Sequence, residues 1–430
     1  MIMPDRIGMF RALRHRDFRL YWLGFVSAVS GMQIFIVAQA WLIFDLTGSA
    51  LDLGLLGLAR AAPAVVLGLA GGVIADKIDQ RRLIMVTSTI TGALYAVMAT
   101  LTVIGIVEVW HILATTFLVA GVQAVDQPSR SAIFPHLIDR RDLTRAVGMN
   151  STIHPGTRIY GPIIAGLMID FIGTPRFGAG IAIYVAGFTY LIFTYMMYRV
   201  RVPEGIQRAS GGSAFQDLKD GMSFIRTTHL FRLFIAMSFV HAAFGMAHVT
   251  ILPVFAEKLT GEATGSALAL LFSATGLGGL IGAIVGGSLA SVRHRGWLVI
   301  GGGGSFGTLL MAFAFAPIYA VAVAFELLAS IANQVFMVVA QSALHAQVPD
   351  ELRGRVMGVW GLTHSLLQPI GGLGMGAATG GLGARAVTAA GGGVIIVFAM
   401  LVGRSREVRF LGTTETPTVS VSPPREPTRV

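Results

Sequence analysis

Ionisable side chains interrupt several long apolar stretches of this 430-residue chain, in which only 13% of the residues are charged and 54% are hydrophobic. Glu326 is the one carboxylate well inside such a stretch. A carboxyl group cut off from water favours its protonated form, which suits a site that takes up and releases protons. Glu326 is therefore the candidate proton-coupling residue. The alternative is a fixed pair in which Glu326 neutralises a buried cation such as Arg60 or Arg158.

Other polar side chains recur at helical spacing, which places them in stripes along one helix face. Four such stripes predict a central, mostly apolar cavity with a few polar anchors. Arg158 would either contact an anionic substrate or pair with Glu326, and each histidine would be either a hydrogen-bonded lining residue or a proton relay. The candidate cavity residues are Arg60, His154, Arg158, His241, His248, Asn333, Trp360, His364 and Gln368.

These side chains belong to apolar segments of about 20 residues, the length that crosses a bilayer as a helix. The fold class is therefore an all-α membrane protein with twelve transmembrane helices. A soluble domain carries about 25% charged residues, far more than this chain. We expect the helices near 20–44, 52–75, 83–105, 110–130, 146–170, 178–198, 231–256, 266–291, 297–316, 318–342, 354–380 and 385–403.

The basic residues fix the expected orientation. With the N-terminus in the cytoplasm, 26 of the 32 Lys and Arg fall in inner segments and three in outer loops. The positive-inside rule then places both termini in the cytoplasm. The net charge of +10 thus reflects membrane topology, and nucleic acid is not an expected partner.

Internal repeats divide the chain into two halves. Gly48-Ser49-Ala50-Leu51 recurs as Gly265-Ser266-Ala267-Leu268, and each copy follows a Leu-Thr-Gly and precedes an apolar span. Parallel six-helix repeats with a site between them are a transporter architecture. We expect an N-terminal half at 1–202, a cytoplasmic linker at 203–225, a C-terminal half at 226–410 and a disordered cytoplasmic tail at 411–430.

A charged cluster, GGVIADKIDQRR at 71–82, separates the second and third spans. It resembles the loop signature of the major facilitator superfamily at Gly72, Asp76, Lys77, Arg81 and Arg82, with Asp79 where most members have glycine. The segments 32–51, 126–151, 158–166 and 348–358 resemble the enterobactin-exporter-like branch of siderophore and drug exporters.

The resemblance implies the major facilitator fold and a gate in which Asp76 faces the start of helix eleven, with Asp126 and Arg130 as partners. A simple positive-inside anchor is the alternative for the charged cluster. Gly161-Pro162 predicts a kink or close-packing point in helix five.

The expected function is export of an amphiphilic, drug-like or siderophore-like small molecule by alternating access and proton antiport, in a monomer of the bacterial inner membrane. A lysophospholipid or lipid transporter and a proton-coupled importer are the alternatives. We expect no enzyme activity, cofactor or metal, because the chain has no cysteine and neither HExxH spacing nor an ATP-binding loop.

Overall fold

The computed structural model describes residues 8–77, 79–202, 214–289, 292 and 294–411, and every regular element among them is helical. The first group of helices comprises η1 (Gly8–Arg14), α1 (Arg16–Thr47), α2 (Ala50–Lys77), α3 (Gln80–Val103), α4 (Val109–Ile133), η2 (Phe134–Leu137), α5 (Leu143–Ser151), α6 (Ile153–Phe171) and α7 (Pro175–Arg199). The second comprises α8 (Ala214–Thr227), α9 (His229–Val240), η3 (His241–Gly245), η4 (Met246–Ile251), α10 (Leu252–Thr260), α11 (Gly265–Leu289), α12 (Arg295–Ala314), α13 (Tyr319–Gln347), α14 (Asp350–Leu382), α15 (Ala384–Gly403) and α16 (Arg406–Arg409).

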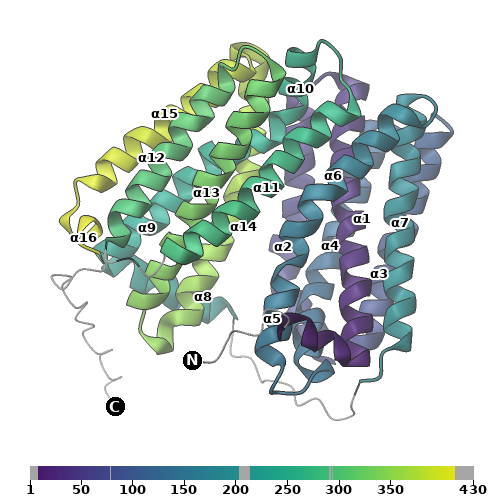
Figure 1. Cartoon of the computed structure of the whole chain (residues 1–430), viewed down its shortest axis with the longest axis horizontal. Helices are drawn as coiled ribbons and strands as arrows, with labels where there is room; N and C mark the ends of the chain where they lie inside the picture. The colour runs from purple at the N-terminus through teal and green to yellow at the C-terminus, as the bar shows by residue number, and fades with distance from the viewer. Residues whose placement is uncertain (1–7, 78, 203–213, 290–291, 293, 412–430) are drawn as a thin grey trace, which may run out of the picture.

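The helices form two bundles that stand side by side, α1–α7 in one and α9–α15 in the other (Figure 1). In this view α15 runs from the top of the molecule down to its left edge, and α1 starts at the lower end of the molecule. We call this the terminus end and the opposite one the distal end. The linker helix α8 lies at the terminus end and packs against α14 through Gly221, whose α-carbon approaches the backbone of Arg355.

The repeat predicted from the sequence is present in the backbone. Each Leu-Thr-Gly ends a helix with a glycine in the left-handed region, Gly48 after α1 (φ 61°) and Gly261 after α10 (φ 84°). Glycine adopts this conformation without steric cost and so stops a helix cleanly. The GSAL motif, whose first copy begins at Gly48 itself, leads into α2 in one bundle and into α11 in the other.

Large apolar side chains cover the outer faces of the bundles, as a lipid environment requires. In α3, α7 and α15, residues such as Val97, Phe188 and Met400 expose more than half of their surface. Nine helical segments within the described residues have the length and hydropathy of membrane spans. Three further long helices, α2, α6 and α14, run beside them (Figure 1). The structure is thus an all-helical membrane fold, and the count of twelve spans stays a prediction.

Two crossed helix pairs join the bundles at the distal end. The helix α6 packs on α11, and α2 packs on α14, so the second long helix of each bundle meets the fifth of the other. Glycines bring the backbones together. A Cβ on Gly166 would lie 2.7 Å from the Gly265 carbonyl oxygen, and one on Gly54 would lie 2.7 Å from the Leu373 α-carbon. Small residues allow such close approach between membrane helices.

A carboxylate adds a polar contact to the same seam. Asp170, near the end of α6, accepts hydrogen bonds from the backbone N–H groups of Gly265 (2.7 Å) and Ser266 (2.8 Å) at the start of α11. Four N–H groups at a helix start lack partners within the helix, and a negative charge there is favourable. Trp41 also donates to the Ala263 carbonyl oxygen across the bundles (2.7 Å). The distal end is therefore sealed by both packing and hydrogen bonds.

Two expected spans are interrupted. The span expected at 146–170 breaks at Thr152 into α5 and α6, because Pro155 has no N–H to bond the carbonyl oxygen of Ser151. The span expected at 231–256 passes through a π-helical turn, η3, and a 3-10 segment, η4, before α10. Pro253 at the start of α10 removes another helical N–H. Irregular turns of this kind are frequent at functional sites.

Candidate functional site

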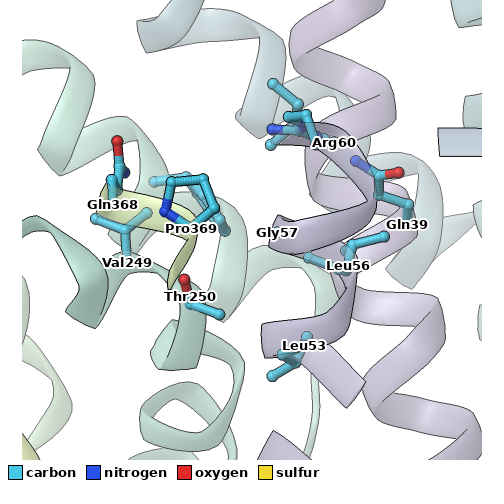
Figure 2. Close-up of a pocket in the computed structure, with 12 residues that line it drawn as sticks. Gln39, Leu53, Leu56, Gly57, Arg60, Val249, Thr250, Gln368 and Pro369 are labelled. Carbon is cyan, nitrogen blue, oxygen red and sulfur yellow. The ribbon is translucent and has the colours of Figure 1, made fainter. Parts of the chain in front are cut away.

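A cavity of about 180 Å³ lies between the two bundles, next to the α2–α14 contact. Figure 2 shows Gln39 of α1 and Arg60 of α2 on one side, with Thr250 of η4 and Gln368 of α14 on the other. Apolar groups, among them Leu53, Leu56, Val249 and Pro369, complete the lining. Polar anchors in an apolar wall are typical of small-molecule sites.

Arg60 also lines two further cavities, whose described lining residues all belong to the N-terminal bundle. The larger, about 540 Å³, extends from Arg60 toward the terminus end and includes Gln127, Asn150 and His154. The smaller, about 220 Å³, includes Tyr95 and Gln123. Arg60 therefore stands where three cavities meet, and its surface faces cavities that belong to the centre of the molecule.

The guanidinium groups of Arg60 and Arg158 interact with each other as like charges. Among the described residues, no carboxylate lies within ion-pair distance of either one. Glu326 acts on Arg158 only through its longer-range field. The expected alternative in which Glu326 forms a salt bridge with Arg60 or Arg158 is thus not what the structure shows.

The direct partner of Glu326 is His248, and both side chains are buried. The Nε2 atom of His248 lies 3.0 Å from Oε2 of Glu326. Its Nδ1 atom lies 2.7 Å from the carbonyl oxygen of Gly245, at the end of the π-helical turn. Thr275 donates another hydrogen bond to Glu326 at 2.9 Å, and Ser330 donates one at 3.4 Å. We call the segment formed by α9, η3, η4 and α10 helix seven, because it corresponds to the seventh expected span. The pair connects the break in helix seven to α13 and α11.

A second side-chain contact joins helix seven to α13. His241 Nε2 bonds the Asn333 side-chain oxygen at 2.6 Å, and its ring stacks on Phe336 and lies tilted against Phe306. The seven-residue spacing of His241 and His248 does put them on one face, but that face packs against α13. Both histidines are buried and do not belong to the wall of the cavity between the bundles. Asn333 is half-buried, and its expected place in a cavity wall stays a prediction.

Trp360, His364 and Gln368 form the expected polar stripe on α14, and one of them lines the cavity between the bundles. Trp360 is buried. The ring centroids of Trp360 and His364 lie 5.4 Å apart, and Nδ1 of His364 lies 3.3 Å from the Ser238 hydroxyl. Only Gln368, one turn further along, reaches the cavity between the bundles. In the N-terminal bundle, the break at Thr152 leaves Asn150 and His154 on one cavity wall, which does not include Arg158.

The charged loop is described in part. Gly72 and Asp76 lie in a part of α2 whose side chains are outside the described residues, so the expected gate contacts of Asp76 stay a prediction. Arg81 donates to the carbonyl oxygen of Met197 (3.0 Å) at the end of α7, and Arg82 follows the helix cap Asp79, which accepts from its N–H at 2.7 Å.

Asp126 and Arg130 pair with each other in α4. Their side chains approach to 3.1 Å, and Thr87 of α3 donates to Asp126 at 2.8 Å. Arg130 also lies over the ring of Phe25, 4.9 Å from its centroid. This cluster holds α1, α3 and α4 together beside the large cavity, and its charges are already balanced.

Gly161 and Pro162 lie within the continuous helix α6. Gly161 packs against Gln33 of α1, where an added Cβ would meet the Gln33 side chain at 2.7 Å. Pro162 cannot donate to the carbonyl oxygen of Arg158. That carbonyl instead faces Gly276 of α11, whose Cβ would lie 2.5 Å from it. The close-packing interpretation of the Gly-Pro pair fits this geometry.

A polar cluster at the terminus end fixes η1 to the start of α5. Asp142 lies 3.1 Å from His15 Nε2 and also bonds Arg145. The hydrogen bonds from His15 and from Arg145 hold the pKa of Asp142 below its ordinary value. Among the described residues, no three His, Asp or Glu side chains gather as metal ligands would.

Sequence reasoning missed two residues of the site. The sequence places Asp170 at the end of a helix, and no residue near it in the sequence indicates that it contacts the other bundle. Gln39 carries a clearer signal, since an amide within the apolar run of α1 needs partners when it is buried. Its Oε1 accepts from Thr116 at 2.7 Å, while its Nε2 is buried without any partner.

Comparison with known proteins decides the family. Residues 7–419 match the model of a family described as transmembrane secretion effector, a branch of the major facilitator superfamily. The chain belongs to this family. It is therefore a multi-pass membrane transporter for small molecules and not an enzyme, as the sequence predicted.

Transporters of siderophores and drugs are among the relatives of this chain. It is 27% identical to a staphyloferrin A transporter of Staphylococcus aureus over 57% of its own length and 60% of the relative's. It is 25% identical to the multidrug efflux pump Tap of Mycolicibacterium fortuitum over 80% of its length and 85% of the pump's. The resemblance to siderophore and drug transporters is confirmed.

Solved structures share the fold. A bacterial homologue of the human lysosomal transporter Spinster, in an inward-facing and unoccupied conformation, aligns with a TM-score of 0.67 over 95% of this chain and 98% of that one. The sequence identity is 14%. The likeness therefore concerns the major facilitator fold alone.

Proposed function

We propose that this transporter exports an amphiphilic small molecule from the bacterial cytoplasm by alternating access. The terminus end then faces the cytoplasm, in keeping with the concentration of basic residues there, and the two bundles act as the N- and C-terminal halves. The observation that carries the proposal is the contrast between the ends. The distal seam is closed by Gly54, Gly166 and Asp170, while the large cavity runs from Arg60 toward the terminus end.

Such a structure is ready to load from the cytoplasmic side. Rocking of the halves would open the distal seam and close the terminus end around the same cavity. The relatives named for multidrug efflux and for a siderophore support an amphiphilic cargo. The mixed lining of the central cavity supports it as well, because apolar walls with isolated amides and one guanidinium suit a molecule with both characters.

Proton antiport is proposed to run through His248 and Glu326 together. A carbonyl oxygen only accepts, so His248 Nδ1 carries a hydrogen that it donates to Gly245. The contact between Nε2 and the Glu326 carboxyl then needs one shared proton, carried by either ring or carboxyl. Removing that proton would set a lone pair against a carboxylate. The pair therefore keeps its proton while helix seven holds this shape, and a rearrangement of the break would release it.

Cellular accumulation tests this function. Cells that lack their own exporters are given a panel of lipophilic drugs and catecholate siderophores, with and without a protonophore. The proposal predicts lower accumulation of at least one compound with the wild-type protein, and loss of this effect with the protonophore or with Glu326→Gln. Glutamine retains the hydrogen bond to His248 but carries no titratable proton. Unchanged or raised accumulation across the panel would contradict export and favour import.

Lipid transport is the second candidate, because an almost wholly apolar cavity of about 500 Å³ opens on the outer face of the C-terminal bundle. It lies between helix seven, α14 and α15 and is lined by Phe239, Phe244, Ile370 and Leu382, all of them exposed. A fluorescent lysophospholipid added to the same panel separates the two functions. Protein-dependent movement of the lysophospholipid, with none of the drugs, would favour the lipid transporter.

A further inference from the structure

The cavity between the bundles combines an unpaired charge with an unused hydrogen-bonding group. Arg60 brings a full positive charge to its wall, and no carboxylate among the described residues neutralises it. Gln39 is completely buried on the same wall, and its Nε2 has no partner. A buried polar group without a partner costs about 1–3 kcal/mol, so such a group calls for an explanation.

Arg60 is exposed, and the surface that it exposes lines cavities near the centre of the molecule. Its side chain borders three separate cavities, and its electrostatic neighbours are Tyr95 and the like-charged Arg158. By contrast, Arg130 in the neighbouring cavity already has Asp126 at 3.1 Å. The uncompensated positive charge is therefore concentrated at Arg60 and Arg158, near the centre of the molecule.

We propose that this cavity binds a carboxylate or similar acidic group of the transported molecule, with Arg60 as the charge partner and the Gln39 amide as a second donor. A guanidinium offers paired N–H groups that match two carboxylate oxygens. Thr250 and Gln368 lie across the cavity and belong to the other bundle (Figure 2). The acidic group would thus be held where both halves contribute to the wall.

The position next to the seam gives the site a consequence for transport. Gly57 and Pro369 line the same cavity, and a Cβ on Gly57 would lie 3.8 Å from the Pro369 α-carbon. An anion between Arg60 and Gln368 therefore sits beside the contact that must separate when the distal end opens. Acidic cargo would compensate the repulsion between Arg60 and Arg158 while it is bound. This inference rests on the proposed export function and adds the substrate class.

The chain has no cysteine, so one introduced thiol reports on the site without other changes. In Gln368→Cys, we would follow thiol labelling in the purified protein in the presence of dansylglycine or of dansylglycinamide. These probes share one body and differ in the carboxylate. We expect protection by dansylglycine alone. Adding Arg60→Gln should weaken this protection roughly ten- to hundredfold, the effect of losing a hydrogen bond to a charged group.

Two controls keep the result interpretable. Arg60→Lys keeps the charge and should restore part of the protection, and the rate of labelling by a small neutral thiol reagent without probe checks that each variant is folded. Equal protection by the two probes, including no protection by either, overturns the proposal. So does protection that Arg60→Gln leaves unchanged.

The inference and the export function can fail separately. If the protein lowers accumulation of neutral and cationic compounds, and Arg60→Gln leaves that export intact, the proposed anion site is refuted and the export function is supported. If dansylglycine protects the introduced thiol in a way that depends on Arg60, but no compound of the cellular panel is exported, the anion site is supported and the proposed direction of transport is refuted.

Discussion

The α2–α14 contact should depend on a single missing methyl group. In Gly54→Ala, the added Cβ would lie 2.7 Å from the α-carbon of Leu373, which is 0.7 Å short of the 3.4 Å at which ordinary van der Waals contact begins. The neighbour is backbone and cannot rotate away, so the two helices must move apart. Gly57→Ala, one turn along the same helix and at the same seam, provides the matched control because its Cβ would meet Pro369 at 3.8 Å.

The expected magnitude follows from the packing. Overfilling a close-packed contact costs about 1–3 kcal/mol, and here the cost falls only on the state with a sealed distal end. Alanine favours helix over glycine in both states, so that gain cancels between them. A shift of 1–3 kcal/mol changes the ratio of two states by roughly 5- to 150-fold. The control should change it little.

Thiol labelling from the distal side measures this ratio. In the Gln368→Cys background, a membrane-impermeant maleimide is added to the outer face of spheroplasts. We expect Gly54→Ala to accelerate labelling by at least fivefold, within the range given above, and Gly57→Ala to label like the background. Equal rates in the two variants would refute the argument that close glycine packing holds the distal end shut.

Three further changes test other parts of the structure. Asp170→Asn removes the charge at the start of α11, and a loss of about 0.3–1 kcal/mol should raise distal labelling roughly two- to fivefold; an unchanged rate would exclude Asp170 from the seal. Glu326→Gln should leave the affinity for an exported compound within about twofold while abolishing its dependence on a pH gradient, and transport that still follows the gradient would exclude Glu326 as the coupling site. Asp142→Asn should lower the melting temperature of the purified protein at neutral pH, because the bonds from His15 and Arg145 hold the Asp142 pKa below 3.8. A lowered pKa stabilises the folded state above the ordinary value and loses that effect as the pH falls through the folded-state pKa, so the difference from wild type should vanish only below pH 3.8; a difference independent of pH would contradict this assignment.

The fold was accessible from the sequence because its strongest determinants are local and periodic. Long apolar runs, the repeated Leu-Thr-Gly and GSAL motifs and the distribution of basic residues each report on one segment and its surroundings. The prediction departs from the structure at two interrupted spans, each of which contains a proline near the interruption. Pro155 and Pro253 each remove an N–H, and the spans that contain them break into shorter helices.

The site was accessible only in part, because hydrogen-bond partners depend on how helices are rotated against one another. Glu326, Arg60 and Gln368 stand out in apolar segments, and all three occupy central positions in the structure. The partner of Glu326 does not follow from spacing. His248 reaches it from the 3-10 segment that follows the π-helical turn, where its Nδ1 also bonds the carbonyl oxygen of Gly245.

The central claim is that movement of substrate outward is exchanged for protons moving inward. The most direct measurement uses proteoliposomes with a pH-sensitive dye inside and a compound identified by the cellular panel. Addition of that compound should produce a proton flux of opposite direction with the wild-type protein, and no flux with Glu326→Gln although the compound still binds. Substrate movement without any proton flux, or with protons moving in the same direction, would contradict the account.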